Sequence, residues 1–294
     1  MSIVITAATG HLGRLVVEEL LRRGVPGGDV VATGRDTSRL ADLADRGVQV
    51  RRADYTDPAS LREAFTGAQR LLLVSSSEVG SRLEQHRNAI TAAGDAGVGL
   101  LAYTSMLHAG TATTTLARDH RATELVLAES DLPHVLLRNG WYVENYTDQL
   151  PTFLAHGIAG AAGDGLVSAA TRQDYAEAAA AVLTAAGSAG ATYELGGDPF
   201  TLTELAAVIS AAVGQPVGYT DLSEADYRGV LLAAGLPEPY AALLADADRG
   251  MRAGELLVDG THRDDLRDLI GRPVTPLADA VGAAVRQLQG ATTG

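Results

Sequence analysis

The chain has 294 residues, of which 46% are hydrophobic, and its formal net charge is −13. Its length allows one large domain or two ordinary ones, and it is long enough to bury a sizeable core. The acidic charge and the lack of any run of basic residues argue against binding of nucleic acid or of an anionic membrane surface. The absence of cysteine excludes disulfides, thiolate nucleophiles and thiolate metal sites, and no apolar run approaches the roughly 20 residues of a membrane span. We therefore expect a cytoplasmic protein without membrane insertion.

The first half of the chain alternates between expected strands and helices. An apolar strand at 3–5 is followed by a helix over 10–24, in which apolar residues recur on one face. Further strands are expected at 30–32, 48–54, 71–74, 99–105 and 134–139, and further helices at 36–47, 57–65, 84–96 and 116–129. This alternation predicts βαβ units and a parallel sheet, and the nearly all-apolar strands indicate helices on both of its faces.

After Asn139 the pattern loosens. Residues 155–166 are rich in glycine and are expected to form a loop, 173–186 an alanine-rich helix, and 191–197 the last strand of the sheet. From Thr201 on the chain is mostly helical, with helices expected at 202–214, 223–235 and 276–288.

These elements predict an α/β fold: a Rossmann-type doubly wound parallel sheet with a smaller, mainly helical C-terminal lobe. Residues 1–139 would form the core and 166–198 would complete it. Residues 140–165 and 199–294 would form the lobe. The cleft between core and lobe is the expected ligand site.

The segment TAATGHLG, from Thr6 to Gly13, joins the first strand to the first helix. Gly10 and Gly13 are three apart, as in the turn that brings a pyrophosphate close to the backbone at a helix N-terminus. Ala7 stands where a third glycine is usual; it costs little if its φ is negative and about 1 kcal/mol or more if its φ is positive. A plain structural turn is the alternative, but the flanking strand and helix favour a nucleotide loop.

Arg35 and Asp36 follow the second expected strand, where a dinucleotide fold places the residue that distinguishes the two nicotinamide cofactors. An arginine suits the 2′-phosphate of NADP, and an acid suits the free ribose of NAD. Arg35 therefore favours NADPH. The alternative is that Arg35 faces solvent and Asp36 takes the ribose.

Several segments together resemble the type 2 NADPH:quinone oxidoreductases of bacteria, which belong to the NmrA-like branch of the atypical short-chain dehydrogenases. They are TAATGHLG, VATGR, LLVSSSEVGSRLEQHRNAI, AYTSMLHA, LRNGWYVENY, AAGDGLVSAATRQDYA and LSEADY. The resemblance covers Ile3 to about Leu288. It implies a core that binds NADPH, a helical lobe over a cleft, and hydride transfer from NADPH to a quinone without flavin.

The resemblance also implies the cofactor site. The glycine turn would hold the pyrophosphate, Arg35 the 2′-phosphate, and Arg172 would reach toward the cofactor. Three serines would end the fourth strand beside it, and the segment from Asn139 would flank the nicotinamide and the quinone. The implied cofactor residues are Thr6, Ala7, Ala8, Thr9, Gly10, His11, Leu12, Arg35, Ser75, Ser76, Ser77, Asn139, Gly140, Trp141, Tyr142, Val143, Glu144, Asn145 and Arg172.

Three aromatic residues, Trp141, Tyr142 and Tyr146, would form flat walls for the quinone. Tyr142 and Tyr146 are four apart and share a helix face, which is more often a core position, and Trp141 would alternatively anchor the lobe. The three serines would alternatively cap a strand end without a ligand.

The polar residues outside these segments are less specific. His86 and His120 are expected on the surface or in packing, and Asp54 either near the adenine or in an exposed loop. No two histidines have the spacing of a metal site such as HExxH, so no metal is expected.

The chemistry is limited by the basic residues, because all 23 are arginine. The Tyr-x-x-x-Lys pair of typical short-chain dehydrogenases is therefore impossible, and no catalytic residue is assigned. The lysine that is usual in the family where Leu125 stands is absent too. A quinone accepts hydride readily, so solvent or a weak donor suffices for the proton, and catalysis reduces largely to positioning two rings.

Two alternatives to an NADPH:quinone oxidoreductase remain. One is an NADP(H)-binding redox sensor of the NmrA type without turnover, which acts on a partner protein. The other is an NADPH reductase of another acceptor, such as an azo compound or an enone. The physiological acceptor stays open, and a homo-oligomer is compatible with the sequence.

Overall fold

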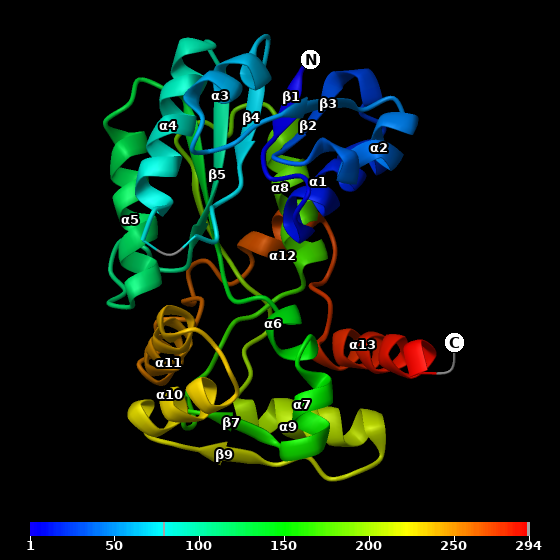
Figure 1. The fold of residues 1–294 in the computed structure, drawn as a ribbon, viewed down its shortest axis with the longest axis vertical. Helices are drawn as coiled ribbons and strands as arrows, with labels where there is room; N and C mark the ends of the chain where they lie inside the picture. Colours follow the sequence, from blue (N-terminus) through cyan, green and yellow to red (C-terminus); the bar gives the residue numbers. More distant parts are fainter. Residues whose placement is uncertain (79, 293–294) are drawn as a thin grey trace.

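The structure is a computed structural model in which residues 1–78 and 80–292 are described. Its main feature is a parallel sheet with the strand order β3–β2–β1–β4–β5–β6–β8. Figure 1 labels the strands β1 to β5 of this sheet. Its strands are β1 (Ile3–Ile5), β2 (Val30–Gly34), β3 (Gln49–Arg52), β4 (Arg70–Leu73), β5 (Leu100–Met106), β6 (His134–Asn139) and β8 (Thr192–Leu195). The order reverses between β1 and β4, and ligands of such sheets bind at this switch point.

Helices cover both faces of the sheet. One face carries α1 (His11–Arg22), α2 (Ala41–Asp45), α8 (Arg172–Thr184) and α12 (Asp265–Ile270); the other carries α3 (Pro58–Phe65), α4 (Arg82–Asp95) and α5 (Thr115–Ala128). Short 3-10 turns, η1 (Gly27–Asp29) and η2 (Thr37–Leu40), flank β2.

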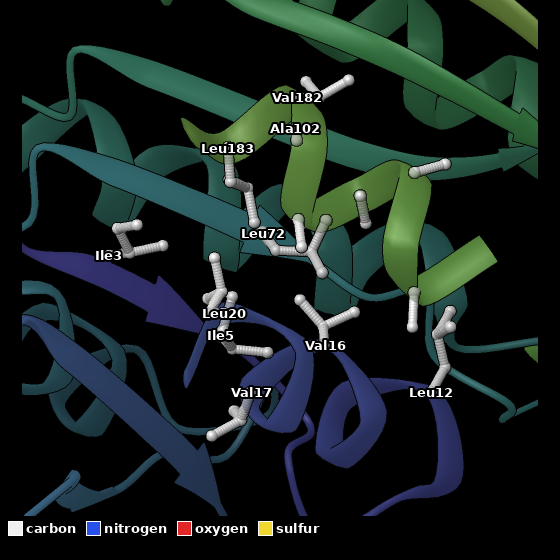
Figure 2. Packing of buried hydrophobic residues seen from close by; sticks show 14 of the residues in the cluster. Ile3, Ile5, Leu12, Val16, Val17, Leu20, Leu72, Ala102, Val182 and Leu183 are labelled. Atoms are coloured by element: carbon white, nitrogen blue, oxygen red, sulfur yellow. The ribbon is translucent and has the colours of Figure 1, made fainter. Parts of the chain in front are cut away.

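The core beneath α1 and α8 shows why the sequence folds in this way. Val16 and Leu20 of α1, Leu183 of α8 and Ile5 and Leu72 of the sheet are all fully buried in one cluster (Figure 2). Each such side chain contributes about 1.5–3 kcal/mol through its removal from water. The alanine-rich face of α8 leaves room for α1 to pack closely beside it. The start of α1 is thereby fixed at the edge of the sheet.

The second lobe, in the lower half of Figure 1, has its own hydrophobic cluster. Its helices are α6 (Glu144–Thr147), α7 (Leu150–His156), α9 (Leu202–Val213), α10 (Glu224–Ala233), α11 (Glu238–Arg252) and α13 (Leu277–Thr292), and its two parallel strands are β7 (Ile158–Gly160) and β9 (Tyr219–Asp221). Within the described residues no helix is long and apolar enough to cross a membrane.

The predicted α/β class, the doubly wound sheet and the helical lobe are confirmed. Two local expectations were wrong. The glycine-rich segment 155–166 is not only a loop, because Ile158–Gly160 form β7 and pair with β9. Gly160 allows this strand to pack closely, since a Cβ there would lie 2.8 Å from Asp248 Oδ2.

The helix expected over 36–47 is instead the 3-10 turn η2 followed by the short α2. Asp36 caps this turn by accepting a hydrogen bond from Ser38 N at 3.1 Å. Leu266 of α12 packs in the cluster under the sheet, although it lies in the segment 199–294 that was assigned to the lobe. The division into core and lobe at the stated boundaries stays a prediction.

Candidate functional site

The turn between β1 and α1 forms one end of the candidate site. Ala7 has a φ of +50°, in the left-handed region that favours glycine. A hydrogen bond of 2.9 Å from Gly10 N to Ala7 O closes the turn. A Cβ on Gly13 would lie 2.5 Å from the same oxygen, so α1 packs against the turn only with a glycine there. The positive φ also settles the question about Ala7: alanine here costs about 1 kcal/mol relative to glycine.

The first turn of α1 presents backbone N–H groups to a ligand. Gly10 is the N-cap residue and offers no side-chain hydrogen bond to them, and the first turn carries no acidic residue. The free N–H groups and the positive end of the helix dipole suit a pyrophosphate. Gly34, at the end of β2, lets Thr9 come close, since a Cβ there would lie 2.5 Å from Thr9 Cγ2.

A cavity of about 580 Å³ lies at the carboxyl ends of the strands. Residues that end or follow β1 through β6 line it, together with the start of α8. Ligands bind at this edge in open α/β sheets. Most of the predicted site residues are among its lining: Thr6, Ala7, Thr9, Gly10, His11, Leu12, Arg35, Ser75, Ser76, Ser77, Asn139, Gly140, Trp141, Tyr142, Asn145 and Arg172.

Ala8, Val143 and Tyr146 do not reach this cavity. Ala8 is fully buried behind the turn, and Val143 packs in the hydrophobic cluster of the lobe. The ring of Tyr146 meets Phe200 edge-on in the same cluster, with 6.0 Å between the ring centroids. Tyr146 thus occupies the core position that its spacing from Tyr142 had left open.

Glu144 also lies outside the lining, but it positions a residue that belongs to it. Its carboxylate accepts a hydrogen bond of 2.8 Å from Arg172 N at the start of α8. The guanidinium of Arg172 lies 5.3 Å from the ring centroid of Tyr142 and donates a 3.2 Å hydrogen bond to Asn145 Oδ1. The cation over the ring face and the hydrogen bond tie α8 to the segment after β6.

Residues of α4 and β5 hold the backbone of the serine segment that follows β4. Ser75 N donates to Thr104 Oγ1 at 2.8 Å, and Ser76 N donates to His86 Nε2 at 2.9 Å. Arg82 Nε donates to Ser76 O at 2.7 Å. Burial, with a smaller effect of the nearby Arg82, lowers the pKa of His86 to about 3, so its ring is neutral and Nε2 can accept. His86 is a fully buried support of the serine loop.

Arg35 and Asp36 have different roles in the structure. Arg35 lines the cavity and forms a 3.2 Å ion pair with Glu78, which also lines it. Asp36 is not among the lining residues, and its carboxylate is engaged with Ser38. Arg39, in the turn η2 that follows Arg35 in the chain, also lines the cavity and carries a second guanidinium. Two cations at this end favour an anionic group such as a 2′-phosphate.

Two buried oxygen atoms mark places for ligand donors. Among the described residues, Gln85 Oε1 and Asn139 Oδ1 are the buried side-chain atoms that lack a hydrogen-bond partner. Both residues line the cavity. Because buried polar groups are normally satisfied, an N–H or O–H of a bound molecule fits at each oxygen.

Sequence reasoning missed part of the site. Ser105 and Met106 end β5, and the rule that ligands bind at strand ends would have found them. Leu116 and His120 lie one turn apart on α5 without any local motif, and His120 was expected only on the surface or in packing. Asp54, for which a place near the adenine and one in an exposed loop were both left open, lines the cavity. Other lining residues that had not been assigned to the cofactor are Gly13, Thr33, Gly34, Arg39, Ala53, Tyr55, Val74, Glu78, Arg82 and Gln85.

Comparisons with known proteins show the family of this chain. The sequence model of the NAD(P)H-binding family matches residues 7–186. Quinone oxidoreductase 2 of Escherichia coli (strain K12) is 50% identical over 281 residues, which is 95% of this chain and 97% of that protein. The crystal structure of an NADPH-dependent quinone oxidoreductase from Escherichia coli, complexed with NADPH, has a TM-score of 0.92 and 48% identity, covering 96% of this chain and 99% of that one. The Citrobacter sp. triphenylmethane reductase complexed with NADP(H) has a TM-score of 0.90 and 37% identity, covering 96% and 100%.

Proposed function

Because this chain belongs to the NAD(P)H-binding family and, within it, to the type 2 quinone oxidoreductases, we propose that it transfers hydride from NADPH directly to a quinone, without flavin. The observation that carries the proposal is one cavity that joins the glycine turn to Trp141 and Tyr142. A dinucleotide and a flat acceptor would meet in it at the carboxyl edge of the sheet.

The residues present fit NADPH. The first turn of α1 offers N–H groups for the pyrophosphate, and Arg35 with Arg39 offers charge for the 2′-phosphate. Asn139 Oδ1 offers an unused acceptor at the end of β6. NADPH supplies the hydride when it is bound, and the protein supplies position.

The acceptor end of the cavity is apolar. Met106, Leu116, Trp141 and Tyr142 line it, and the side chains of Leu116 and Trp141 also pack on the hydrophobic cluster of the lobe. A quinone ring would bury apolar area against them. Since the chain has no lysine, catalysis rests on holding the two rings together and on weak hydrogen-bond donors.

The proposal extends to organisation and setting. A core of residues 1–139 and 166–198 would hold the cofactor, and a lobe of residues 140–165 and 199–294 would cover the acceptor. The cytoplasm is the proposed compartment. The oligomeric state, including a homo-oligomer, is a matter for direct measurement by light scattering.

The test is consumption of NADPH, and in parallel of NADH, by the purified protein with a simple naphthoquinone. Loss of NADPH absorbance that depends on both protein and quinone, with a strong preference over NADH, is the expected result. NADPH binding without turnover would point to a redox sensor instead. Failure to bind either cofactor would overturn the proposal.

A reductase of a different acceptor is a second candidate, favoured by the 0.90 TM-score with the triphenylmethane reductase. The same assay with a cationic triphenylmethane dye and with an azo dye separates the two. A higher kcat/KM for a dye than for any quinone in a graded series would assign the site to that acceptor.

A further inference from the structure

His120 and Leu116 occupy neighbouring turns of one face of α5. The residues are four apart, and both line the cavity, beside Ser105 and Met106 at the end of β5. His120 is 5% exposed, so its ring is buried apart from what it presents to the cavity. This face of α5 therefore places the polar ring of His120 beside the apolar residues of the proposed acceptor end.

The hydrogen bond behind His120 fixes the position of its proton. The hydroxyl of Tyr103 lies 2.8 Å from His120 Nδ1, and Tyr103 is fully buried. Thr123 also forms a hydrogen bond to this hydroxyl, and it does so as a donor, since the bond opposes the rise that burial causes in the pKa of Tyr103. Nδ1 is thus the acceptor that is left for the Tyr103 O–H, which donates to it rather than remaining unsatisfied. A neutral His120 then carries its proton on Nε2.

His120 is neutral at ordinary pH. Burial lowers its pKa well below the usual value, and the nearby Arg82 and His86 lower it further. A neutral imidazole with a proton on Nε2 donates a hydrogen bond but does not give up that proton at pH 7. Within the described residues no other group is hydrogen-bonded to Nε2, so this N–H is available to a ligand in the cavity.

The hydroxyl of Ser105, at the end of the neighbouring strand β5, already donates its hydrogen to another residue of the protein. Ser105 Oγ donates to Glu124 Oε1 at 2.5 Å, and Glu124 is held in turn by Arg138 at 2.6 and 2.9 Å. Ser105 therefore faces the cavity as an acceptor. Ser76 N is likewise used by His86. His120 Nε2–H, by contrast, is a donor that lines the cavity and is not used by another described residue.

We propose that His120 donates a hydrogen bond through Nε2–H to the quinone oxygen that gains negative charge during reduction. The inference rests on the proposed quinone reduction. The quinone takes up the hydride with its electron pair, and one of its oxygens is anionic until a proton from water neutralises it. His120 keeps its own proton and stabilises that oxygen, in the manner of an oxyanion-hole donor. Tyr103 is a positioning residue, because it acts only by fixing the tautomer of His120.

The test compares His120→Phe, which keeps a ring but has no donor, with His120→Gln, which restores an N–H. The kcat with a naphthoquinone should fall about 10- to 100-fold in H120F and recover in part in H120Q, while the Kd for NADPH stays within about twofold. A kcat equal to wild type in H120F would overturn the inference. A Kd for NADPH that rises with kcat retained would also overturn it, and would assign His120 to the cofactor ribose.

A second variant protects the test against misfolding. H120F leaves the buried Tyr103 hydroxyl without a partner, and His120→Phe combined with Tyr103→Phe removes both members of the pair. The double variant should show thermal unfolding close to wild type and the same loss of kcat as H120F. A Tyr142→Phe variant provides the competing outcome: loss of kcat there, with none in the double variant, would assign the donor to Tyr142.

A direct readout of the tautomer does not depend on turnover. In protein labelled with ¹⁵N-histidine, His120 should show the Nε2–H tautomer in wild type and a mixture in Tyr103→Phe, with kcat a few-fold lower and KM unchanged in that variant. An Nδ1–H tautomer in wild type would sink the inference. Absence of quinone turnover in the wild type would instead remove the proposed function, so the two failures are distinguishable.

Discussion

The two ends of the cavity are built in different ways. The end proposed for the pyrophosphate is one continuous stretch, Thr6 to Gly13, which offers its backbone shape and free N–H groups to a ligand. The end proposed for the acceptor gathers Met106, Leu116, His120 and Trp141 from three separate segments. The first end depends on backbone geometry and tolerates no extra atom at certain glycines. The second depends on side chains that buried residues hold in place, as Tyr103 holds His120, and its properties can be changed one group at a time.

Gly13→Ala tests the first end most severely. The new Cβ would lie 2.5 Å from Ala7 O and 2.9 Å from Ala8 Cα, and these backbone atoms cannot move without separating α1 from β1. We expect the Kd for NADPH to rise by about 100-fold or more and the unfolding temperature to fall. Calorimetric titration and thermal unfolding measure both.

Gly10→Ala is the matched control, because its Cβ would meet Ala7 O at 3.3 Å, a contact that a small shift relieves. Its effect on NADPH binding should be several times smaller. Equal binding by G13A and wild type would contradict the view that the turn is shaped by close backbone packing.

The lobe contains a partly buried carboxylate, Asp248, which makes its stability depend on pH. Its Oδ2 accepts a 2.7 Å hydrogen bond from Ala161 N, and burial raises its pKa to about 6, with a further rise from Asp221 and an opposing effect of Arg252. The folded protein therefore holds this proton more tightly than the unfolded chain. The free energy of unfolding should fall as the pH rises from about 4 to about 6, by an amount on the order of 3 kcal/mol, and stay lower above that range.

Asp248→Asn removes this titration while an amide oxygen can still accept from Ala161 N. The free energy of unfolding can be measured with urea at pH 4.5 and 7.5. The part of its fall with rising pH that comes from Asp248 should appear in wild type and be absent in D248N. A pH dependence identical in the two proteins would mean that Asp248 titrates normally in the folded state.

Arg35→Ala tests the side chains at the nucleotide end. Loss of the guanidinium should raise the Kd for NADPH about tenfold or more and leave that for NADH nearly unchanged, since only NADPH carries the 2′-phosphate. Glu78→Gln should have the opposite effect on the Kd for NADPH and lower it, because the 3.2 Å ion pair with Glu78 competes with the phosphate for Arg35. Equal losses for both cofactors in R35A would show that Arg35 does not recognise the phosphate.

The contrast between the two ends explains what the sequence could predict. The strands and helices of the core follow from local periodicity, and the glycine turn and Arg35 are recognisable because their roles depend on neighbours in the chain. The spacing of Tyr142 and Tyr146 allowed both a core and a ligand position. Tertiary packing separated them, with Tyr142 at the cavity and Tyr146 against Phe200.

The supports of the site had no local signal at all. His86 meets Ser76 across the α4–β4 junction, and Tyr103 meets His120 across the interface of β5 and α5. A short strand such as β7 was equally hidden, because its partner β9 lies some 60 residues further along the chain. Such contacts are set by topology, and a single sequence carries no pattern that marks them.

Ala7→Gly should give the smallest effect, and it tests the backbone of the turn most directly. Because φ at this position is +50°, glycine relieves left-handed strain that alanine carries, and the free energy of unfolding should rise by about 1 kcal/mol, net of the greater freedom of glycine in the unfolded chain. His108 is the matched control: it too has a positive φ, of +52°, but its Nε2 lies 2.8 Å from Leu257 O. His108→Gly would relieve similar strain and lose that hydrogen bond, so it should not stabilise the protein. Chemical unfolding of both variants decides the matter, and a destabilised A7G would mean that the turn holds alanine without strain.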